Sequence, residues 1–589
     1  MSFDNLVQIV RAHGTAQPQQ PFLRFHRDGR WQELSWGEAL TRVEAIAGGL
    51  AALGVVPGDR VAILSANRPE WALADLGSLA AAAVVATVYP TLTPEETGFI
   101  LAHSGAKAIF VENTSQLEKL RGIRDRLPML RHIIVLEGHP TTDAHSLAEV
   151  ERFAREDASR AVVDRAAMAP RRTPLTIVYT SGTTGVPKGA ILTHGNIIGT
   201  IEAVLQAFGD VSRLRLSLSF LPLAHALERV AGHFLPIYLG RTIAYARSLE
   251  TLAEDFPVVR PDFAVAVPRV FEKVLARILA QVDGKPPLAR ALFHWAVAVG
   301  TRRSQLEENG RPIPLSLRVR QGVADLLVAR TIRTRLGGRI QLFVSGGAPL
   351  AEHIARFFHA MGILVCEGWG ATETSAPATW NTPSAFRLGS VGKPLPGVEV
   401  KIAPDGELLV RGCNVFAGYH DNPEETAAVF EPDGFYRSGD IGTVDADGFY
   451  YITDRKKELI ILASGKNIAP QKIEGLLKQR TLISNAMAFG DRHPFLVALV
   501  AVDRIPLTAR HPELASAGPS EPALRQLIAA EIEVVNEKLA RFEQIKRFAI
   551  VEPDFTPEGG ELTLTMKLKR RVIESKHRDT LQALYAEGR

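Results

Sequence analysis

A short segment between Tyr179 and Gly189 carries the residue types that bind an anionic polyphosphate. Its sequence, Tyr179-Thr-Ser-Gly-Thr-Thr-Gly-Val-Pro-Lys-Gly189, follows an apolar run and ends on a single lysine. Glycines let the backbone turn tightly and point N–H groups inward, while the hydroxyls add donors and Lys188 adds a cation. The alternative is a surface turn, but the length of the hydroxyl run after a strand favours a phosphate loop. A P-loop is excluded because Lys188 lies between Pro187 and Gly189, whereas that motif requires Gly before the lysine and Ser or Thr after it.

The elements that must position this loop alternate between helix and strand signals. Ser35-Trp-Gly-Glu38 and Thr93-Pro-Glu-Glu96 are capping boxes, whose side chains bond the free backbone N–H groups at a helix start. Apolar runs predict buried strands over residues 61–64, 108–111, 133–136 and 175–179. This alternation predicts an α/β domain with a largely parallel sheet.

The pattern changes to hairpins from about residue 387. Residues 398–402 and 407–410 flank Asp405-Gly406, and Asp447-Gly448 precedes the apolar run 449–452. After Arg455 a further small unit is expected. Its predicted strand covers residues 495–502, and its predicted helix has Ile528, Ile532, Val535 and Leu539 on one face.

We therefore predict an α/β fold with mixed α+β subdomains in two domains. Residues 1–454 form a large N-terminal domain of layered α/β subdomains with a β-rich subdomain. Residues 455–589 form a small α+β domain, with the boundary in the charged stretch Asp454-Arg-Lys-Lys-Glu458.

Composition narrows the class of protein without identifying it. The chain has 589 residues, 46% hydrophobic and 22% charged, which are ordinary values for a globular protein. Its formal net charge of only +4 argues against a dedicated nucleic-acid binder. Cys366 and Cys413 are too few for a disulfide framework and suit a reducing compartment. With no secretion signal at the N-terminus and no apolar run long enough to span a bilayer, a cytoplasmic location is expected.

Five segments, in order along the chain, resemble the motifs of the adenylate-forming superfamily of acyl-CoA synthetases, luciferases and peptide-synthetase adenylation domains. They are the loop at residues 179–189, Ser345-Gly-Gly-Ala-Pro-Leu350, Glu367-Gly-Trp-Gly-Ala-Thr-Glu373, Tyr436-Arg-Ser-Gly-Asp440 and Arg455. The resemblance covers nearly the whole chain. It implies an enzyme that uses ATP and Mg²⁺, with coenzyme A as co-substrate.

The resemblance also implies a role for each motif residue. The residues that would contact the phosphates are Thr180, Ser181, Gly182, Thr183, Thr184, Gly185 and Lys188. Those that would surround adenine are Gly346, Gly347, Ala348, Pro349, Gly368, Trp369 and Gly370. Thr372 would contact the α-phosphate, and Glu373 would help to hold Mg²⁺. Asp440 and Arg455 would contact the ribose.

Residue chemistry agrees with these roles but leaves alternatives open. A carboxylate such as Asp440 can accept hydrogen bonds from two vicinal hydroxyls, but it equally suits a turn-stabilising aspartate. Glu373 suits Mg²⁺, which one or two carboxylates usually hold together with substrate phosphates, or else a helix start. Trp369 offers a large stacking face, although such a residue is more often a core aromatic.

Two segments resemble the long-chain fatty acyl-CoA synthetases in particular. These are Phe220-Leu-Pro-Leu-Ala-His-Ala-Leu-Glu-Arg-Val230 and Pro261-Asp-Phe-Ala-Val-Ala-Val-Pro-Arg-Val-Phe271. His225 matches a position that lines the acyl pocket beside the carboxylate. On its chemistry alone, it is as readily a packed or capped histidine. The acyl tunnel should be apolar, but the sequence does not indicate which elements line it.

The resemblance gives the C-terminal domain the remaining chemistry and makes it mobile. Lys567 aligns with the lysine that catalyses adenylation, although Met566 replaces the usual glycine and Lys569 is a second candidate. For Lys569 to Arg571, a solvated basic tail or a membrane-surface patch is the competing interpretation. Lys457 matches the hinge about which the domain rotates. Gly465, in Ala463-Ser-Gly-Lys-Asn467, would lie closest to the pantetheine channel.

The expected function is ATP-dependent ligation of a long-chain fatty acid to coenzyme A through an acyl-adenylate, with release of pyrophosphate and AMP. The alternatives are an aryl- or medium-chain acyl-CoA ligase, or a fatty acyl-AMP ligase that passes its product to a carrier protein. A catalytically silent nucleotide- or lipid-binding relative is the rival from another class. Small-molecule substrates are expected, with no nucleic acid, and peripheral membrane contact is compatible with long-chain acids.

Overall fold

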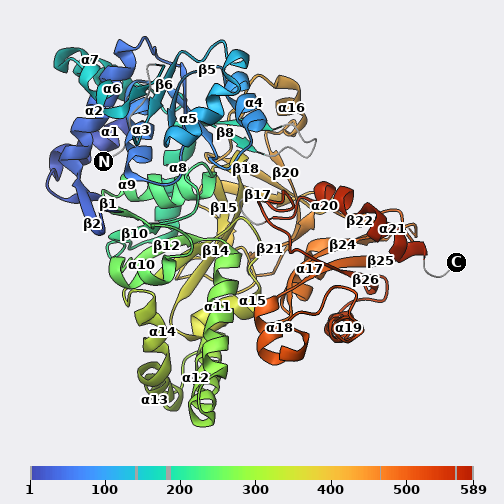
Figure 1. Cartoon of the computed structure of the whole chain (residues 1–589). Coiled ribbons are helices and arrows are strands. Elements are labelled where there is room, and N and C mark those ends of the chain that lie inside the picture. The colour runs from blue at the N-terminus through green and yellow to red at the C-terminus, as the bar shows by residue number, and fades with distance from the viewer. Residues whose placement is uncertain (1–2, 139–142, 181–186, 465, 564–566, 587–589) are drawn as a thin grey trace.

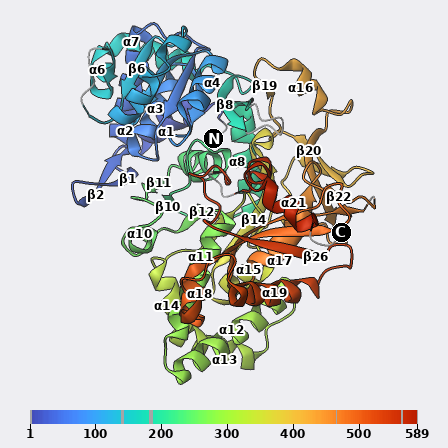
Figure 2. The same ribbon diagram turned by 45° about the vertical axis from the view of Figure 1, so that its right-hand side comes forward.

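The computed structural model of the chain describes residues 3–138, 143–180, 187–464, 466–563 and 567–586 (Figure 1). Within these residues the fold is mixed α/β, as predicted. The larger sheets lie toward the N-terminal part of the chain, and a smaller three-stranded sheet lies at the C-terminal side (Figures 1 and 2).

The first sheet has the strand order β19-β9-β8-β4-β3-β5-β6-β7. Its strands are β3 (Arg60–Leu64), β4 (Val84–Val88), β5 (Ala106–Val111), β6 (His132–Val135), β7 (His145–Ser146), β8 (Pro174–Thr180), β9 (Lys188–Thr193) and β19 (Gly418–Tyr419). The run from β8 to β7 is parallel, whereas β9 and β19 are antiparallel additions. The predicted strands and the largely parallel sheet are thus confirmed.

Helices cover both faces of this sheet, which is why its central strands are continuously apolar. In β3, Val61 and Ile63 face one hydrophobic core while Ala62 and Leu64 face another. The helices are α1 (Leu6–Ala16), α2 (Trp36–Ala52), α3 (Pro69–Ala80), α4 (Pro94–Ser104), α5 (Thr114–Arg121), α6 (Leu147–Phe153) and α7 (Glu156–Ala167). Both predicted capping boxes are present, at the starts of α2 and α4.

The second sheet has the strand order β16-β15-β14-β13-β12-β10-β11-β1-β2 and is parallel from β14 to β1. Its strands are β1 (Pro21–Arg27), β2 (Arg30–Ser35), β10 (Leu216–Ser219), β11 (Thr242–Tyr245), β12 (Phe263–Ala266), β13 (Leu342–Ser345), β14 (Leu364–Ala371), β15 (Ala376–Trp380) and β16 (Lys393–Pro394). The helices along this part are α8 (His194–Phe208), the π-helix η2 (Glu228–Phe234), α9 (Leu235–Tyr238), α10 (Leu252–Val259), α11 (Pro268–Asp283), α12 (Pro287–Glu308), α13 (Leu315–Ala324), the π-helix η3 (Asp325–Ala329), α14 (Arg330–Arg335) and α15 (Glu352–Ala360). Figure 1 shows α12 and α13 projecting from the lower end of the molecule.

A third, antiparallel sheet contains the predicted hairpins. Its strand order is β17-β18-β20-β21, with β17 (Val398–Ile402), β18 (Glu407–Gly412), β20 (Tyr436–Val444) and β21 (Tyr450–Arg455), and α16 (Pro423–Ala428) precedes β20. The turns at Asp405-Gly406 and Asp447-Gly448 join these strands as predicted.

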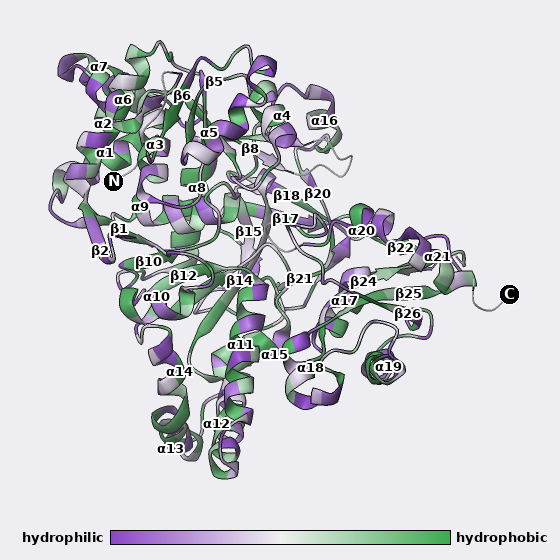
Figure 3. Ribbon diagram, in the orientation of Figure 1, coloured by the Kyte–Doolittle hydropathy of each residue, from purple (hydrophilic) through white to green (hydrophobic). Residues whose placement is uncertain are grey.

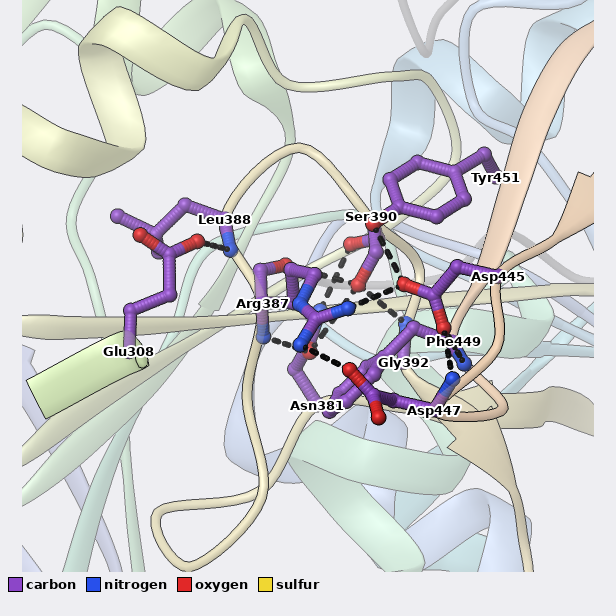
Figure 4. A network of polar contacts seen from close by, with 10 residues as sticks. All are labelled: Glu308, Asn381, Arg387, Leu388, Ser390, Gly392, Asp445, Asp447, Phe449 and Tyr451. Carbon is purple, nitrogen blue, oxygen red and sulfur yellow. Dashed lines mark hydrogen bonds and ion pairs between the residues drawn. The ribbon is translucent and has the colours of Figure 1, made fainter. Parts of the chain in front are cut away.

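Arg387 fastens the β20–β21 hairpin to the second sheet (Figure 4). Its guanidinium lies 2.5 Å from Asp445 Oδ2 and 2.8 Å from Asp447 Oδ2, and the backbone N–H of Arg387 donates to Asn381 Oδ1. The backbone N–H of Asn381 in turn donates to the carbonyl of Glu367 in β14 at 2.9 Å. The network therefore couples two strands, β14 and β20, that carry predicted site residues.

Replacing Arg387 with Ala is expected to lower the free energy of unfolding by about 1–2 kcal/mol, because two carboxylates lose a partly buried partner. Burial raises the pKa of Asp445, but the N–H of Phe449 and the Arg387 guanidinium outweigh it and hold that pKa at about 2. The ionised carboxylate thus favours the folded state, and this contribution is lost as pH falls from about 4 toward 2. Urea unfolding across that pH range measures both effects. The matched control Arg411→Ala removes an exposed ion pair to Glu399 and should leave the urea midpoint nearly unchanged; an equal shift in both variants would contradict the fastening role.

The C-terminal part has its own sheets and cores. The strands are β22 (Ile460–Ile461) paired with β23 (Asn467–Ile468), and β24 (Ile483–Phe489), β25 (Leu496–Val502) and β26 (Ile545–Val551) in one sheet. The helices are α17 (Pro470–Lys478), α18 (Arg504–Arg510), α19 (Pro522–Asn536), α20 (Arg570–Lys576) and α21 (Arg578–Ala586). Alternate residues of β25 enter two cores, with Val500 on one face and Leu499 on the other.

The domain division at residues 454 and 455 stays our prediction. It falls at the end of β21, between a core that includes Tyr450 and one that begins at Ile460. Among the described helices, none has the length and apolar character needed to cross a membrane.

Candidate active site

The predicted phosphate loop connects two antiparallel strands, β8 and β9, and Thr180 pairs with Lys188 across its base. The predicted contacts Ser181, Gly182, Thr183, Thr184 and Gly185 lie outside the described residues. The structure therefore places the two ends of the loop, at Thr180 and Lys188.

Lys188 is held in place by side chains that the loop sequence does not contain. Its ammonium group lies 2.5 Å from Glu425 Oε2 and 5.5 Å from the centre of the Tyr419 ring. Tyr419 belongs to β19, which pairs with β9 and so brings the ring beside the lysine. A cation over an aromatic face is attracted to the ring's electron density.

Glu373 is linked to the same tyrosine. Thr372 and Glu373 lie in the 3-10 turn η4 (Thr372–Thr374), directly after β14. The Tyr419 hydroxyl donates to Glu373 Oε1 at 2.8 Å, and the Glu373 carbonyl accepts the N–H of Phe416. The residue is only 8% exposed, so these contacts hold a buried carboxyl group on the tyrosine whose ring Lys188 faces.

This carboxylate fits the Mg²⁺ that the resemblance implies. Within the described residues, no group of three or more His, Cys, Asp or Glu side chains is arranged to hold a metal ion. Mg²⁺ does not need such a cage, since it usually combines one or two carboxylates with water and substrate phosphates. Glu373 is the residue that would hold it.

The predicted adenine wall follows β13. Gly346, Gly347, Ala348 and Pro349 lie after its last residue, and Gly347 has a positive φ of 84°, which glycine adopts without strain. Glu367 Oε1 accepts the N–H of Leu350 at 2.9 Å and so ties this segment to β14. Burial raises the pKa of Glu367 to about 8, despite that hydrogen bond.

β14 carries the other predicted adenine contacts, Gly368, Trp369 and Gly370. A Cβ at Gly370 would lie 1.7 Å from the carbonyl oxygen of Ala376, so the strand can bend back tightly only with glycine there. The Trp369 indole N–H donates to Asp440 Oδ2 at 2.8 Å. The indole is thereby oriented by the carboxylate.

Asp440 joins this aromatic to Arg455. The two residues face each other across β20 and β21, and Arg455 Nε donates to Asp440 Oδ1 at 2.9 Å. The charge of Asp440 is the main reason why the pKa of Arg455 is raised. Each carboxylate oxygen has two lone pairs, so both can still accept hydrogen bonds from a ligand's hydroxyls.

His225 lies just before η2 with its Nδ1 accepting the N–H of Leu227 at 3.2 Å. Burial, and then the positive charge of Lys567, lower the pKa of His225 to about 4. The ring is therefore neutral at pH 7, with its proton on Nε2 available to donate.

Lys567 brings a charge from the C-terminal part of the chain to this site. The residue as a whole is exposed, yet loss of water around its ammonium group and then the charge of Arg455 lower its pKa to about 8. Asp440 and Glu458 act in the opposite direction. Lys567 thus interacts electrostatically with both the ribose pair and His225, whereas Lys569 is the N-cap of α20. The role of Lys567 as the active-site lysine stays our prediction.

Lys457, the predicted hinge, is exposed in the turn between β21 and β22. Arg455 lies two residues before Lys457. A backbone rotation at Lys457 would therefore leave Asp440 and Arg455 in place while it moved the residues after Lys457. Gly465 lies outside the described residues.

A cavity of about 2840 Å³ adjoins the site. It touches the site at Ala224, next to His225, and at Pro349 of the adenine wall. From there it extends between α11, α12 and η3–α14. The apolar side chains that line this part include Leu275, Ile278, Val282, Leu292, Phe293, Val328 and Ile332. The rest of the lining is more polar and includes residues of the C-terminal part of the chain, such as Lys472, Arg480 and Arg504.

Sequence reasoning missed Tyr419, Glu425 and Glu367. Glu367 is the first residue of the motif that ends at Glu373, but the resemblance gives a role to Trp369 and Glu373 and none to Glu367. Tyr419 and Glu425 lie outside every motif, and only the pairing of β19 with β9 brings them to Lys188.

A family profile described as AMP-binding enzyme matches residues 10–420, and one for the AMP-binding enzyme C-terminal domain matches residues 457–589. The chain belongs to the AMP-binding enzyme family. The predicted superfamily membership is confirmed.

Relatives of this AMP-binding enzyme agree in name with the predicted subgroup. It is 36% identical over 591 residues to the long-chain-fatty-acid–CoA ligase FadD15 of Mycobacterium bovis, covering 99% of this chain and 97% of that protein. It is 31% identical over 608 residues to the long-chain-fatty-acid–CoA ligase ACSBG1 of Homo sapiens, covering 96% and 83%.

Solved structures confirm the fold. The anthranilate CoA ligase AuaEII in complex with anthranoyl-AMP superposes with a TM-score of 0.75 at 20% identity, covering 99% of both chains. The A-PCP didomain of a carboxylic acid reductase from Segniliparus rugosus, in complex with AMP, gives 0.74 at 21% identity, covering 100% of this chain and 83% of that one.

Proposed function

We propose that this enzyme ligates a long-chain fatty acid to coenzyme A through an acyl-adenylate, with ATP as the energy source. The observation that carries the proposal is the position of Lys567. The charges of Arg455 and Asp440 act on its pKa, and its own charge acts on the pKa of His225, whose neighbour Ala224 lines the large, mainly apolar cavity. The names of the full-length relatives support the same reaction.

In the first half-reaction a carboxylate oxygen of the acid attacks the α-phosphorus of ATP. The bond from that phosphorus to the bridging oxygen breaks, and pyrophosphate leaves with the electron pair. Lys567 places a positive charge where negative charge develops, which is the kind of contribution that dominates phosphoryl-type transfer. His225 can donate its Nε2–H to the acid's carboxylate and orient it.

The remaining residues hold the nucleotide. Asp440 accepts the ribose hydroxyls, and Trp369, oriented by its bond to Asp440, presents a face to adenine. Lys188 and Thr180 contact the phosphates, and Thr372 contacts the α-phosphate. Glu373 would hold Mg²⁺, which neutralises charge on the phosphates when bound.

In the second half-reaction the thiol of coenzyme A attacks the acyl carbonyl and loses its proton, while the bond to AMP breaks. Rotation at Lys457 would carry Lys567 away and bring the segment around Gly465 to the acyl group. Because both steps rely on positioning and charge, the protein needs no covalent nucleophile. Cys366 is buried, and Cys413 forms no disulfide, which suits the cytoplasmic location we propose.

Thioester formation tests the proposal directly. Purified enzyme is incubated with ATP, Mg²⁺ and coenzyme A, and with saturated acids from eight to twenty carbons or with benzoate. We expect acyl-CoA and pyrophosphate in equal amounts, with kcat/KM rising toward the longer chains because each buried CH₂ adds about 0.8 kcal/mol of binding. Preference for benzoate or for the shortest acids, pyrophosphate release without thioester, or absence of acid-dependent pyrophosphate would each reject it.

A further inference from the structure

The surface formed by α12, α13, η3 and α14, residues 287–335, combines exposed apolar side chains with a concentration of positive charge. We call this segment the projecting helices. It contains nine arginines and only three acidic residues, Glu307, Glu308 and Asp325, and no lysine. Its formal net charge is therefore +6, against +4 for the whole chain.

The three acidic side chains already form ion pairs within the fold. Asp325 pairs with Arg333 at 2.6 Å, and Glu308 pairs with Arg356 of α15 at 2.9 Å. Glu307 lies 3.6 Å from Arg303. The other seven arginines are exposed, and none of them forms an ion pair within the part of the chain that the structure describes. They are Arg290, Arg302, Arg311, Arg318, Arg320, Arg330 and Arg335.

An apolar stripe runs along the same helices. Leu315, Val319, Val323 and Leu326 recur at intervals of four, four and three residues, so they share one helix face. Leu315 is 77% exposed and Leu326 64%. The opposite face, with Ala324, packs against α12, so the stripe is not needed for the internal contact.

The stripe ends beside the cavity that adjoins the site, because Leu327, the next residue after Leu326, lines that cavity. Leu279 of α11 and Leu327 of η3 both line that cavity, and both are also exposed, by 39% and 49%. Leu288 and Trp295, on one face of α12, add further exposed apolar surface nearby in the chain. Figures 1 and 2 both place α12 and α13 at the end of the molecule away from α7, and Figure 3 shows hydrophobic residues on α13 among hydrophilic ones.

We propose that the projecting helices dock on an anionic lipid bilayer and bring the outer end of the apolar cavity to the membrane surface. Apolar side chains flanked by arginines are what an interfacial helix requires, since the apolar residues enter the acyl boundary while the guanidinium groups stay with the lipid phosphates. Trp295 suits the same interface. A second copy of this chain is a poorer occupant, because arginines of the projecting helices that form no ion pair among the described residues would face the same arginines of the other copy.

One consequence of docking rests on the proposed function: a fatty acid could enter the cavity directly from the lipid. Docking itself needs neither ATP nor acid. A failure of docking is therefore distinguishable from a failure of catalysis.

The test is co-sedimentation of the full chain with vesicles of phosphatidylcholine, with or without phosphatidylglycerol. We expect binding to the anionic vesicles, weak binding to the neutral ones, and release between about 0.1 M and 0.5 M salt as the charges are screened. In the triple variant Arg318→Gln/Arg320→Gln/Arg330→Gln, partitioning should fall about 100-fold, since each basic residue near the surface contributes about fivefold.

Two further variants complete the test. Leu315→Ser/Val319→Ser/Leu326→Ser should also lose binding, whereas the matched control Arg155→Gln/Arg160→Gln/Arg165→Gln on and beside α7 should bind like the parent chain. Thermal unfolding verifies that each variant is folded. Absence of vesicle binding, an equal loss in the control, or a dimer that the apolar variant dissociates without any vesicle binding would overturn the proposal. Capture of a protein partner by this face in place of lipid would overturn it as well.

Discussion

Replacing Lys567 with Ala is expected to slow acyl-adenylate formation by about 100- to 1,000-fold, while thioester formation from supplied acyl-adenylate largely survives. The reason is that Lys567 provides charge at the α-phosphate in the first step and leaves the site before the second. Pyrophosphate release measures the first half-reaction, and single-turnover conversion of synthetic acyl-adenylate with coenzyme A measures the second. Equal loss in both steps would contradict the role, and Lys569→Ala is the matched control, expected to retain most of both.

The pH dependence gives an independent check on the same residue. Loss of water and the charge of Arg455 lower the pKa of Lys567 to about 8, so the neutral amine accumulates above that pH. kcat/KM for adenylation, which reports the free enzyme, should therefore fall as pH rises through about 8. In Lys567→Arg the side chain stays charged, and this alkaline limb should disappear. An unchanged limb in that variant would assign the titration to another group.

The elements of the fold were predictable where they depend on local signals. The capping box at Ser35 and Glu38 needs only residues three apart, and the apolar run at Val61 belongs to a strand buried on both faces. The hairpin at Asp405-Gly406 likewise requires only its turn residues and flanking strands. In each case the information lies within a few residues of the feature.

The contacts that complete the site were not predictable in this way. Tyr419 reaches Glu373 across 46 residues of sequence, and Trp369 reaches Asp440 across 71. The motifs indicated that Glu373, Trp369 and Asp440 belong to one site, but which atoms bond depends on how β14, β19 and β20 are packed. For the same reason the lining of the cavity could not be assigned, since apolar helices such as α11 look alike before their neighbours are known.

The Asp440 carboxylate carries the second large expected effect. It accepts hydrogen bonds from Trp369 and Arg455 and would accept two more from the ribose, each worth about 1.5–3 kcal/mol because the acceptor is charged. Asp440→Ala should therefore weaken ATP binding by about 100-fold or more, as measured by titration calorimetry. Asp433→Ala, at an exposed ion pair with Lys401 before β20, is the matched control and should bind ATP normally.

A nucleotide without ribose hydroxyls separates the two ways in which Asp440 could act. If the carboxylate binds the ribose directly, the parent enzyme should already bind 2′,3′-dideoxy-ATP weakly, and Asp440→Ala should add little to that loss. If Asp440 acts only by orienting Trp369 and Arg455, the substitution should weaken both nucleotides by the same factor. Trp369→Phe, which keeps an aromatic face but removes the indole N–H, isolates the orienting contribution. Because one hydrogen bond is removed, we expect about a tenfold effect there, alike for both nucleotides. A dideoxy-ATP loss in Asp440→Ala as large as the ATP loss would therefore refute direct ribose binding, even if the variant binds ATP as weakly as expected.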